Sequence, residues 1–181
     1  MWLTTFTQKI EDWASRTEIV FKLAEKYYHD VIRKEIILAN ITAKDHILCI
    51  GGGICPFSAI LLHKTTGAKV TVIDNNRSCV TKAKQVIARL GLSKHMQVLC
   101  QDGRSSDISF CEYTVVHFAL QVCPMECVFS NVEEKVAPGT KMLVRRTKGQ
   151  TETHCHCPLT LHKTACNIGS TSLYIKACYT Q

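Results

Sequence analysis

The fold of this chain is decided by the stretch His46-Ile47-Leu48-Cys49-Ile50-Gly51-Gly52-Gly53-Ile54-Cys55-Pro56-Phe57. Its first five residues form a short apolar run that is typical of a buried strand, and the triple glycine ends that run with a turn. Pro56 is tolerated in the first turn of a helix, where its missing N–H costs no hydrogen bond. The stretch therefore predicts a strand, a glycine turn and a helix in immediate succession.

The same alternation continues toward the C-terminus. Residues 69–73 have the composition of a second buried strand, and Asp74-Asn75-Asn76 after it carry side chains that suit a helix start. An apolar stripe at helical spacing then runs up to Gly91, which fits a left-handed helix cap. Further elements are expected as strands at 96–100, 113–119 and 141–145, a helix at 125–136 and a last strand at 172–178.

Strands that alternate with helices predict an α/β fold with a mostly parallel sheet and helices on both faces. The last strand alternates polar and apolar residues, so we expect it to be an antiparallel edge strand. Residues 5–40 carry apolar residues at helical spacing, with a break near 15–17, and predict two amphipathic helices. We therefore expect one domain, 1–181, made of a short helical N-terminal extension, 1–42, and a Rossmann-like core, 45–181.

The composition restricts the class of protein. The 181 residues are 46% hydrophobic and 20% charged, which excludes disordered, collagen-like and coiled-coil chains. Eleven cysteines at irregular spacing favour a reducing cytoplasm over a disulfide framework. The start of the chain lacks the order of a signal peptide, and no apolar run reaches the ~18 residues that span a membrane. We expect a cytoplasmic protein without a membrane partner.

The net charge of +7 favours an anionic partner without naming one. The sequence has no block of five or six Lys and Arg residues and no basic stripe interleaved with aromatic residues, so we do not expect nucleic acid as the partner.

Two features predict where a ligand binds. The glycines Gly51 to Gly53 have no Cβ to block a close approach, and the helix after them presents unpaired N–H groups. Asp74 ends the second strand, where a carboxylate can accept both hydroxyls of a ribose. Together they indicate a nucleotide site at the carboxyl ends of the strands, although a tight turn and a helix-capping Asp would give the same pattern.

The kind of nucleotide is narrowed by Pro56. A dinucleotide fingerprint needs a third glycine there, whereas S-adenosylmethionine has no phosphate to cradle. The segments Ile47 to Gly53, Val72-Ile73-Asp74, Gln101-Asp102-Gly103 and Pro138-Gly139 resemble the class I S-adenosylmethionine-dependent methyltransferase fold. Within that fold, segments Ile50 to Leu62, Val136 to Gly149 and Asn167 to Ile175 are most similar to the nicotianamine synthase family.

This resemblance implies a set of cofactor contacts. Gly51, Gly52 and Gly53 would approach the methionine and adenosine parts, Asp74 with Asn75 after it would lie at the ribose, and Asp102 with Gly103 would lie near the adenine. After the fourth strand, Ala119 and Leu120 would line the cleft under the sulfonium.

The chain departs from the family pattern in two ways. Cys49 stands where methyltransferases usually carry an acidic residue, and the synthases have a larger helical N-terminal domain that closes the reaction chamber. A partner subunit could supply such a cap, which leaves a homodimer open.

Candidates for acid–base chemistry are Tyr28, His29 and His117. Each has a structural alternative, because a tyrosine at this place can pack as core or lid and a lone His in an apolar strand is commonly a hydrogen-bonded core residue. No signature of amino-directed DNA methyltransferases follows the fourth strand.

Other residues carry weaker signals. The loop from His154 to Cys157 contains soft metal ligands at a spacing unlike a structural zinc site, so no metal is expected. Arg145, Arg146 and Lys148 could meet a substrate carboxylate or lie at a solvated strand end. The strand cysteines are expected to be small buried hydrophobic residues: Cys49, Cys100 and Cys178.

The sequence therefore predicts a transferase that uses S-adenosylmethionine, with methyl transfer to a small-molecule acceptor as the first hypothesis. The alternatives are aminocarboxypropyl transfer of the nicotianamine synthase type, and an accessory protein that binds cofactor or metal without turnover.

Overall fold

A computed structural model describes residues 18–104, 109–146 and 171–177, with side chains described from residue 28 onward. The strands are β1 His46–Ile50, β2 Lys69–Asp74, β3 Met96–Cys100, β4 Val115–Phe118, β5 Lys141–Arg145 and β6 Thr171–Ile175. The helices are α2 Glu18–Ala39, α3 Phe57–Thr66, α4 Arg77–Arg89, α5 Met125–Lys135 and a single 3₁₀ turn, η1, Phe110–Glu112. The first helix expected from the sequence and the His154 to Cys157 loop lie outside the described residues.

The strands form one sheet in the order β3-β2-β1-β4-β5-β6. All neighbouring pairs are parallel except β5 and β6, which are antiparallel. The strand order reverses between β1 and β4, where ligand sites of such sheets lie. The expected α/β fold with an antiparallel last strand is confirmed. Two strands are shorter than expected: β4 begins at Val115 rather than at 113, after η1, and the last strand ends at Ile175 rather than at 178, a residue outside the described ranges.

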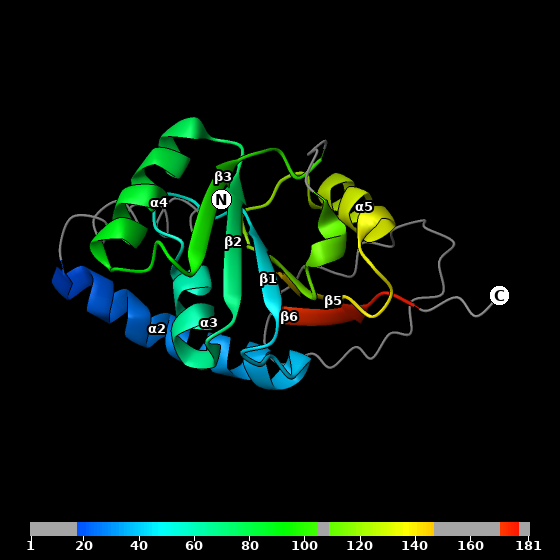
Figure 1. Cartoon of the computed structure of the whole chain (residues 1–181), viewed down its shortest axis with the longest axis horizontal. Coiled ribbons are helices and arrows are strands. Elements are labelled where there is room, and N and C mark those ends of the chain that lie inside the picture. Colours follow the sequence, from blue (N-terminus) through cyan, green and yellow to red (C-terminus); the bar gives the residue numbers. More distant parts are fainter. Residues whose placement is uncertain (1–17, 105–108, 147–170, 178–181) are drawn as a thin grey trace.

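Two apolar layers cover the two faces of the sheet, as the alternation of side chains along each strand requires. One layer contains Ile47 and Cys49 of β1 and packs against α2, α3 and α4; the other contains Leu48 and Ile50 and packs against α5 and η1. Figure 1 shows α3 and α4 on one side of the sheet and α5 on the other. Helix α2 is thus part of the same core as the strands.

The ends of α4 follow the local signals in the sequence. The Asn76 side chain accepts hydrogen bonds from the N–H groups of Ser78 and Cys79 and caps the helix start. At the other end Gly91 adopts φ 72°, and Leu92 N–H donates to Ile87 O at 3.0 Å, which is the Schellman arrangement. This helix start places α4 beside the carboxyl end of β2.

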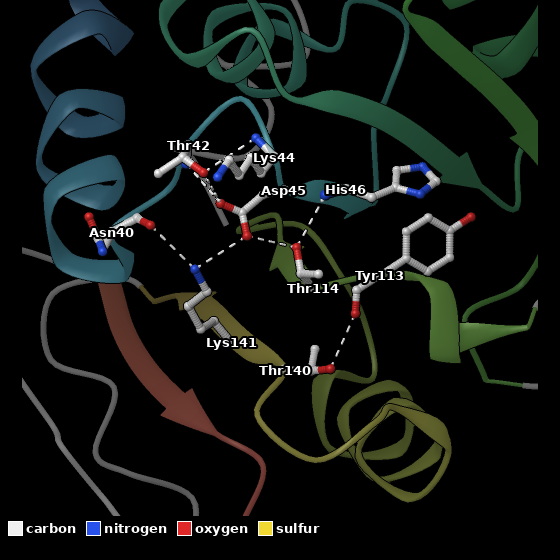
Figure 2. Close-up of polar contacts among 9 residues, drawn as sticks. All are labelled: Asn40, Thr42, Lys44, Asp45, His46, Tyr113, Thr114, Thr140 and Lys141. Atoms are coloured by element: carbon white, nitrogen blue, oxygen red, sulfur yellow. Dashed lines mark hydrogen bonds and ion pairs between the residues drawn. The ribbon is translucent and has the colours of Figure 1, made fainter.

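A polar cluster joins the end of α2 to the amino ends of the strands (Figure 2). The Asp45 carboxylate accepts from Thr42 N–H at 2.7 Å and from the Thr114 hydroxyl at 2.8 Å, and Lys141 Nζ lies 3.4 Å away. Lys141 also donates to the carbonyl of Asn40. Burial alone would raise the pKa of Asp45, but these hydrogen bonds and Lys141 lower it. The cluster lies at the sheet edge opposite the carboxyl ends.

The cysteines expected on strands differ in their burial. Cys49 is buried, as expected, whereas the expectation for Cys100 was wrong because it ends the edge strand β3 and is exposed. Cys178 lies outside the described residues. None of the seven cysteines in the described ranges forms a disulfide. Within the same ranges, no helix has the length and apolar character needed to cross a membrane.

Candidate functional site

A pocket of about 510 Å³ opens at the carboxyl ends of β1, β2 and β3 and the loop after β4. This volume is in the range of small-molecule sites. The lining residues are Ile50, Gly51, Gly53, Ile54, Ile73, Asp74, Asn75, Asn76, Ser78, Cys79, Lys82, Gln101, Asp102, Gly103, Gln121, Val122, Cys123 and Val128. One part of the wall is apolar and another carries carboxylate, amide and hydroxyl groups, which suits a ligand with both a flat apolar part and hydroxyls.

The glycine turn is held by the neighbouring strand. Gly51 and Gly53 have φ of 81° and 62°, a region that residues with a Cβ rarely adopt. Gly51 and Gly52 both donate their N–H groups to the carbonyl of Ile73. Gly51 and Gly53 line the pocket, while Gly52 faces the sheet, where a Cβ would lie 2.2 Å from Cγ1 of Val72. The three glycines therefore differ in role: Gly51 and Gly53 form part of the pocket wall, and Gly52 is required by packing against Val72.

Asp74 lies where the sequence places it, at the end of β2 and in the pocket wall. Its Oδ2 accepts the Gly53 N–H at 2.8 Å and its Oδ1 accepts the Asn76 N–H at 2.9 Å. A carboxylate has about four acceptor positions, so acceptor capacity remains for ligand hydroxyls. Asn75 beside it also lines the pocket.

The turn after β3 forms a further wall. Asp102 and Gly103 both line the pocket, as does Gln101 before them. Hydrogen bonds from Arg104 to both carboxylate oxygens of Asp102 lower the pKa of that carboxyl, which therefore carries a negative charge at neutral pH. Gly103 is buried, and a Cβ there would lie 2.8 Å from Cγ1 of Val128. The sequence Gln101-Asp102-Gly103 thus supplies one charged group and one position without room for a side chain.

After β4, the residues that line the pocket are not the two that were expected but the three that follow them in the sequence. Ala119 and Leu120 are half-buried but are not among the residues that line the pocket. Ala119 N–H donates to Ile50 O at 3.0 Å, which continues the sheet beyond β4. The next residues, Gln121, Val122 and Cys123, line the pocket instead.

The three acid–base candidates are not brought to the pocket wall. Tyr28 is half-buried and stacks on Phe57 with ring centroids 5.8 Å apart. His29 is exposed beside Asp30 on the outer side of α2. His117 is buried at 1% exposure, and its Nε2 lies 3.3 Å from Oε2 of Glu35. A catalytic role for any of them stays a prediction.

A buried ion pair that sequence reasoning missed lies beside His117. Glu35 of α2 is 1% exposed, and its carboxylate accepts two hydrogen bonds from Arg145, at 2.7 Å from Nε and 2.8 Å from Nη2. The Thr171 hydroxyl donates to the same carboxylate at 2.7 Å. Burial would raise the pKa of Glu35, but His117 and Arg145 lower it strongly. Arg145 is therefore neither a solvated strand end nor open to a substrate carboxylate.

Two further basic residues, Arg146 and Lys148, follow the end of β5. Arg146 donates to the Tyr174 hydroxyl at 2.6 Å, which joins β5 to β6, and Lys148 lies outside the described residues. One signal could have found Glu35: it falls on the helical stripe of Tyr28, Ile32 and Ala39, which faces the core. A carboxylate at a core position requires a buried partner.

Cys49 faces this cluster, because it is the register partner of His117 on the neighbouring strand. Burial raises the pKa of its thiol to about 12; Arg145 opposes this shift and Glu35 adds to it. The thiol is therefore neutral at physiological pH and acts as a packing group. Among the described residues, no group of three or more His, Cys, Asp or Glu side chains is arranged to hold a metal ion.

We expect the free energy of unfolding to fall as the pH is lowered from 7 to 5. Burial lowers the pKa of His117 below its ordinary 6.5, with Glu35 opposing and Arg145 adding to that shift. Below pH 6.5 the unfolded chain therefore binds a proton that the native chain excludes, and this favours unfolding. Glu35, with its lowered pKa, adds a further loss below its ordinary 4.5.

Urea unfolding at several pH values measures this dependence. In the His117→Gln variant, the free energy of unfolding should depend less on pH between 6.5 and 5. Part of the dependence should remain, because burial also lowers the pKa of His46. A wild-type stability that is constant or rises over this interval would contradict the assignment.

Comparisons with known proteins agree with this geometry. The family model of nicotianamine synthase protein matches residues 25–158. A mutant of MtNAS, whose crystal structure is in complex with S-adenosylmethionine, superposes with a TM-score of 0.77 at 18% identity, covering 94% of this chain and 71% of that chain. An RNA methyltransferase from Salinibacter ruber, solved with S-adenosyl-L-homocysteine, has a TM-score of 0.64 at 20% identity, covering 84% of this chain and 94% of that chain.

A curated relative gives a shorter match. The L-histidine 2-aminobutanoyltransferase of Yersinia pestis is 29% identical over 72 residues, which are 40% of this chain and 27% of that protein. The match thus spans about a quarter of the curated relative. The two structural likenesses show a Rossmann-like methyltransferase fold. Since the family model covers well over half of the residues, this chain belongs to the nicotianamine synthase family.

Proposed function

We propose that this protein is an S-adenosylmethionine-dependent transferase that moves the aminobutanoyl (aminocarboxypropyl) group of the cofactor to an amino group of a small acceptor. The observation that carries the proposal is the pocket at the reversal of strand order, with Gly51, Gly53 and Asp74 in one wall, in a chain of this family. The curated relative, named for the same kind of transfer to histidine, supports the choice of group.

The residues present fit this cofactor. Gly51 and Gly53 leave room for its amino acid part, and the free acceptor positions of Asp74 suit the ribose hydroxyls. The apolar wall suits the adenine ring, and it consists of Ile50, Ile54, Ile73, Val122 and Val128. When bound, S-adenosylmethionine supplies an activated sulfonium carbon, so the protein's main task is to hold an acceptor nucleophile in line with it.

Methyl transfer to a small molecule is the second candidate. The alignment covers 94% of the Salinibacter ruber methyltransferase, so the structural likeness extends over nearly all of that enzyme. The two reactions differ only in which carbon bonded to the sulfonium the acceptor attacks. For an amine acceptor, the nitrogen lone pair forms the new bond to carbon as the carbon–sulfur bond breaks. The electron pair of that bond goes to sulfur, which leaves as a neutral thioether, and the nitrogen then releases one proton to solvent.

Product analysis separates these candidates. The purified protein is incubated with S-adenosylmethionine and an amino acid mixture that includes histidine, and the nucleoside products are resolved by chromatography. Methylthioadenosine is expected for aminobutanoyl transfer. S-adenosylhomocysteine would instead establish methyl transfer, and neither product above a heat-denatured control, despite measurable cofactor binding, would favour an accessory binding protein.

Asp74→Ala should weaken S-adenosylmethionine binding by about 1–3 kcal/mol, because a charged acceptor in the pocket wall is lost. Isothermal titration calorimetry measures the affinity, and circular dichroism checks that the fold is retained. The matched control is Asp30→Ala, an aspartate with an 85% exposed side chain on the outer face of α2, which should leave the affinity unchanged. Equal affinities of the folded Asp74→Ala variant and the wild type would rule out the ribose contact.

A further inference from the structure

The Arg145 guanidinium is oriented by Glu35, and it also contacts the Ser58 hydroxyl and the Tyr28 ring. Two parallel hydrogen bonds to the Glu35 carboxylate fix its plane. Its remaining terminal nitrogen, Nη1, donates to the Ser58 hydroxyl at 2.7 Å. Its central carbon lies 5.8 Å from the ring centroid of Tyr28, within the range of a cation–π contact. The position of this guanidinium therefore depends on a carboxylate from α2.

Of these two groups, the Ser58 hydroxyl belongs to the first turn of α3, and the Tyr28 ring, which α2 carries, packs against that turn. Ser58 is the second residue of that helix, and Tyr28 stacks nearly parallel, at 10°, on the ring of Phe57, the first residue. The Phe57 N–H donates to the carbonyl of Cys55 at 2.8 Å. Residues 51–56 form the glycine turn directly before this helix, and Gly51, Gly53 and Ile54 of that turn line the pocket, so the first turn of α3 is joined through the backbone to the pocket wall.

The charge that balances Arg145 comes from outside the strands. Cys49 of β1 faces the same cluster but is neutral, and His117 of β4 is held neutral by burial. Glu35 is therefore the negative group of the described residues in this cluster, and it stands on the helix that precedes the first strand. The shape of the start of α3 thus depends on α2 being docked.

We propose that Glu35 is a positioning residue for the cofactor pocket: it holds Arg145 against Ser58 and Tyr28 and thereby sets the start of α3 and the glycine turn. This inference rests on the proposed use of S-adenosylmethionine and assigns part of the pocket's geometry to the N-terminal helix. It does not require Glu35 or Arg145 to touch the ligand.

The test compares Glu35→Leu with the double variant Glu35→Leu/Arg145→Met. The single change leaves Arg145 buried without a counter-charge and should lower the urea midpoint of unfolding, whereas the double change replaces the pair by apolar groups and should restore most of it. The double variant should nevertheless bind S-adenosylmethionine about tenfold more weakly by calorimetry, as expected of residues that act on a site indirectly. If the Glu35–Arg145 pair only stabilised the fold, the double variant would recover both the urea midpoint and the affinity for S-adenosylmethionine.

The matched control is Lys141→Met, which breaks the Asp45 ion pair at the opposite edge of the sheet (Figure 2). It should lower the midpoint without changing the affinity. Wild-type affinity in the double variant would overturn the proposal. If that variant does not fold, Arg145→Lys takes its place, since lysine keeps the charge but lacks the planar fork; wild-type affinity there would overturn it equally.

A second readout distinguishes this inference from the proposed function. The stacked Phe57 ring should shift the ring signals of Tyr28 in NMR spectra. We expect these signals to move in the double variant while those of Tyr113, which packs on His46, stay unchanged. If the wild type bound no S-adenosylmethionine, the proposed function would fail, and unchanged Tyr28 signals in the double variant would then show that Glu35 positions nothing.

Discussion

Glu35→Ala should lower the free energy of unfolding by about 3–5 kcal/mol, the usual cost of breaking a buried ion pair by removing one partner. The cost is large because the Arg145 guanidinium, 8% exposed, would keep its charge in the interior, where Ser58 would be its remaining hydrogen-bond acceptor among the described residues. The Thr171 hydroxyl would also lose its acceptor. A loss of this size is a large fraction of the stability of an ordinary domain.

Urea unfolding followed by circular dichroism measures this loss. The control is Glu134→Ala, an exposed glutamate on α5, which should change the free energy of unfolding by less than about 0.5 kcal/mol. If Glu35→Ala were no more destabilising than this control, the ion pair would contribute nothing, and its geometry would be incidental.

Gly52→Ala is the second large effect, because the structure has no room for one methyl group there. The added Cβ would lie 2.2 Å from Cγ1 of Val72, a fully buried residue of β2 whose branched side chain cannot turn away. Overpacking of this kind costs about 1–3 kcal/mol or more. The glycine turn also has to move, so the affinity for S-adenosylmethionine should fall as well.

A compensating substitution gives the decisive measurement. Val72→Ala removes the clashing methyl group, so the double variant Gly52→Ala/Val72→Ala should be more stable than the sum of the single losses by about 1 kcal/mol or more. The comparison variant is Gly139→Ala. Apart from its two chain neighbours, no atom of the described residues lies within 4 Å of a Cβ there, so the strain of its φ of 86° is the cost that remains. Val72→Ala should not rescue Gly139→Ala. Strict additivity of Gly52→Ala and Val72→Ala would contradict the steric account.

The strands, the glycine turn and the caps of α4 could be predicted because they depend on neighbours in the sequence. Short apolar runs, a glycine triplet and an Asn before a helix each act over a few residues. The pocket position followed from the strand order that such alternation implies, and Asp74 was placed by ending the second strand. These parts of the site are determined by residues that lie close together in the sequence.

The remaining parts depend on contacts between distant segments. Glu35 and Arg145 are 110 positions apart, and nothing in a helix pattern says which strand end its core carboxylate will meet. The sequence likewise suggested that Gly52 faces a ligand, whereas its contact is with Val72 on another strand. His117 was offered as a possible base because sequence alone does not show which face of β4 meets α2.

The long separation within the Glu35 cluster has a consequence for the order of folding. During synthesis at roughly 5–20 residues per second, Arg145 leaves the ribosome several seconds after Glu35, and Thr171, 136 positions on, later still. Until then a docked α2 would bury a carboxylate without its partners, which is unfavourable. We therefore predict that helix α2 docks on the sheet late in folding, after the partners of Glu35 are in place.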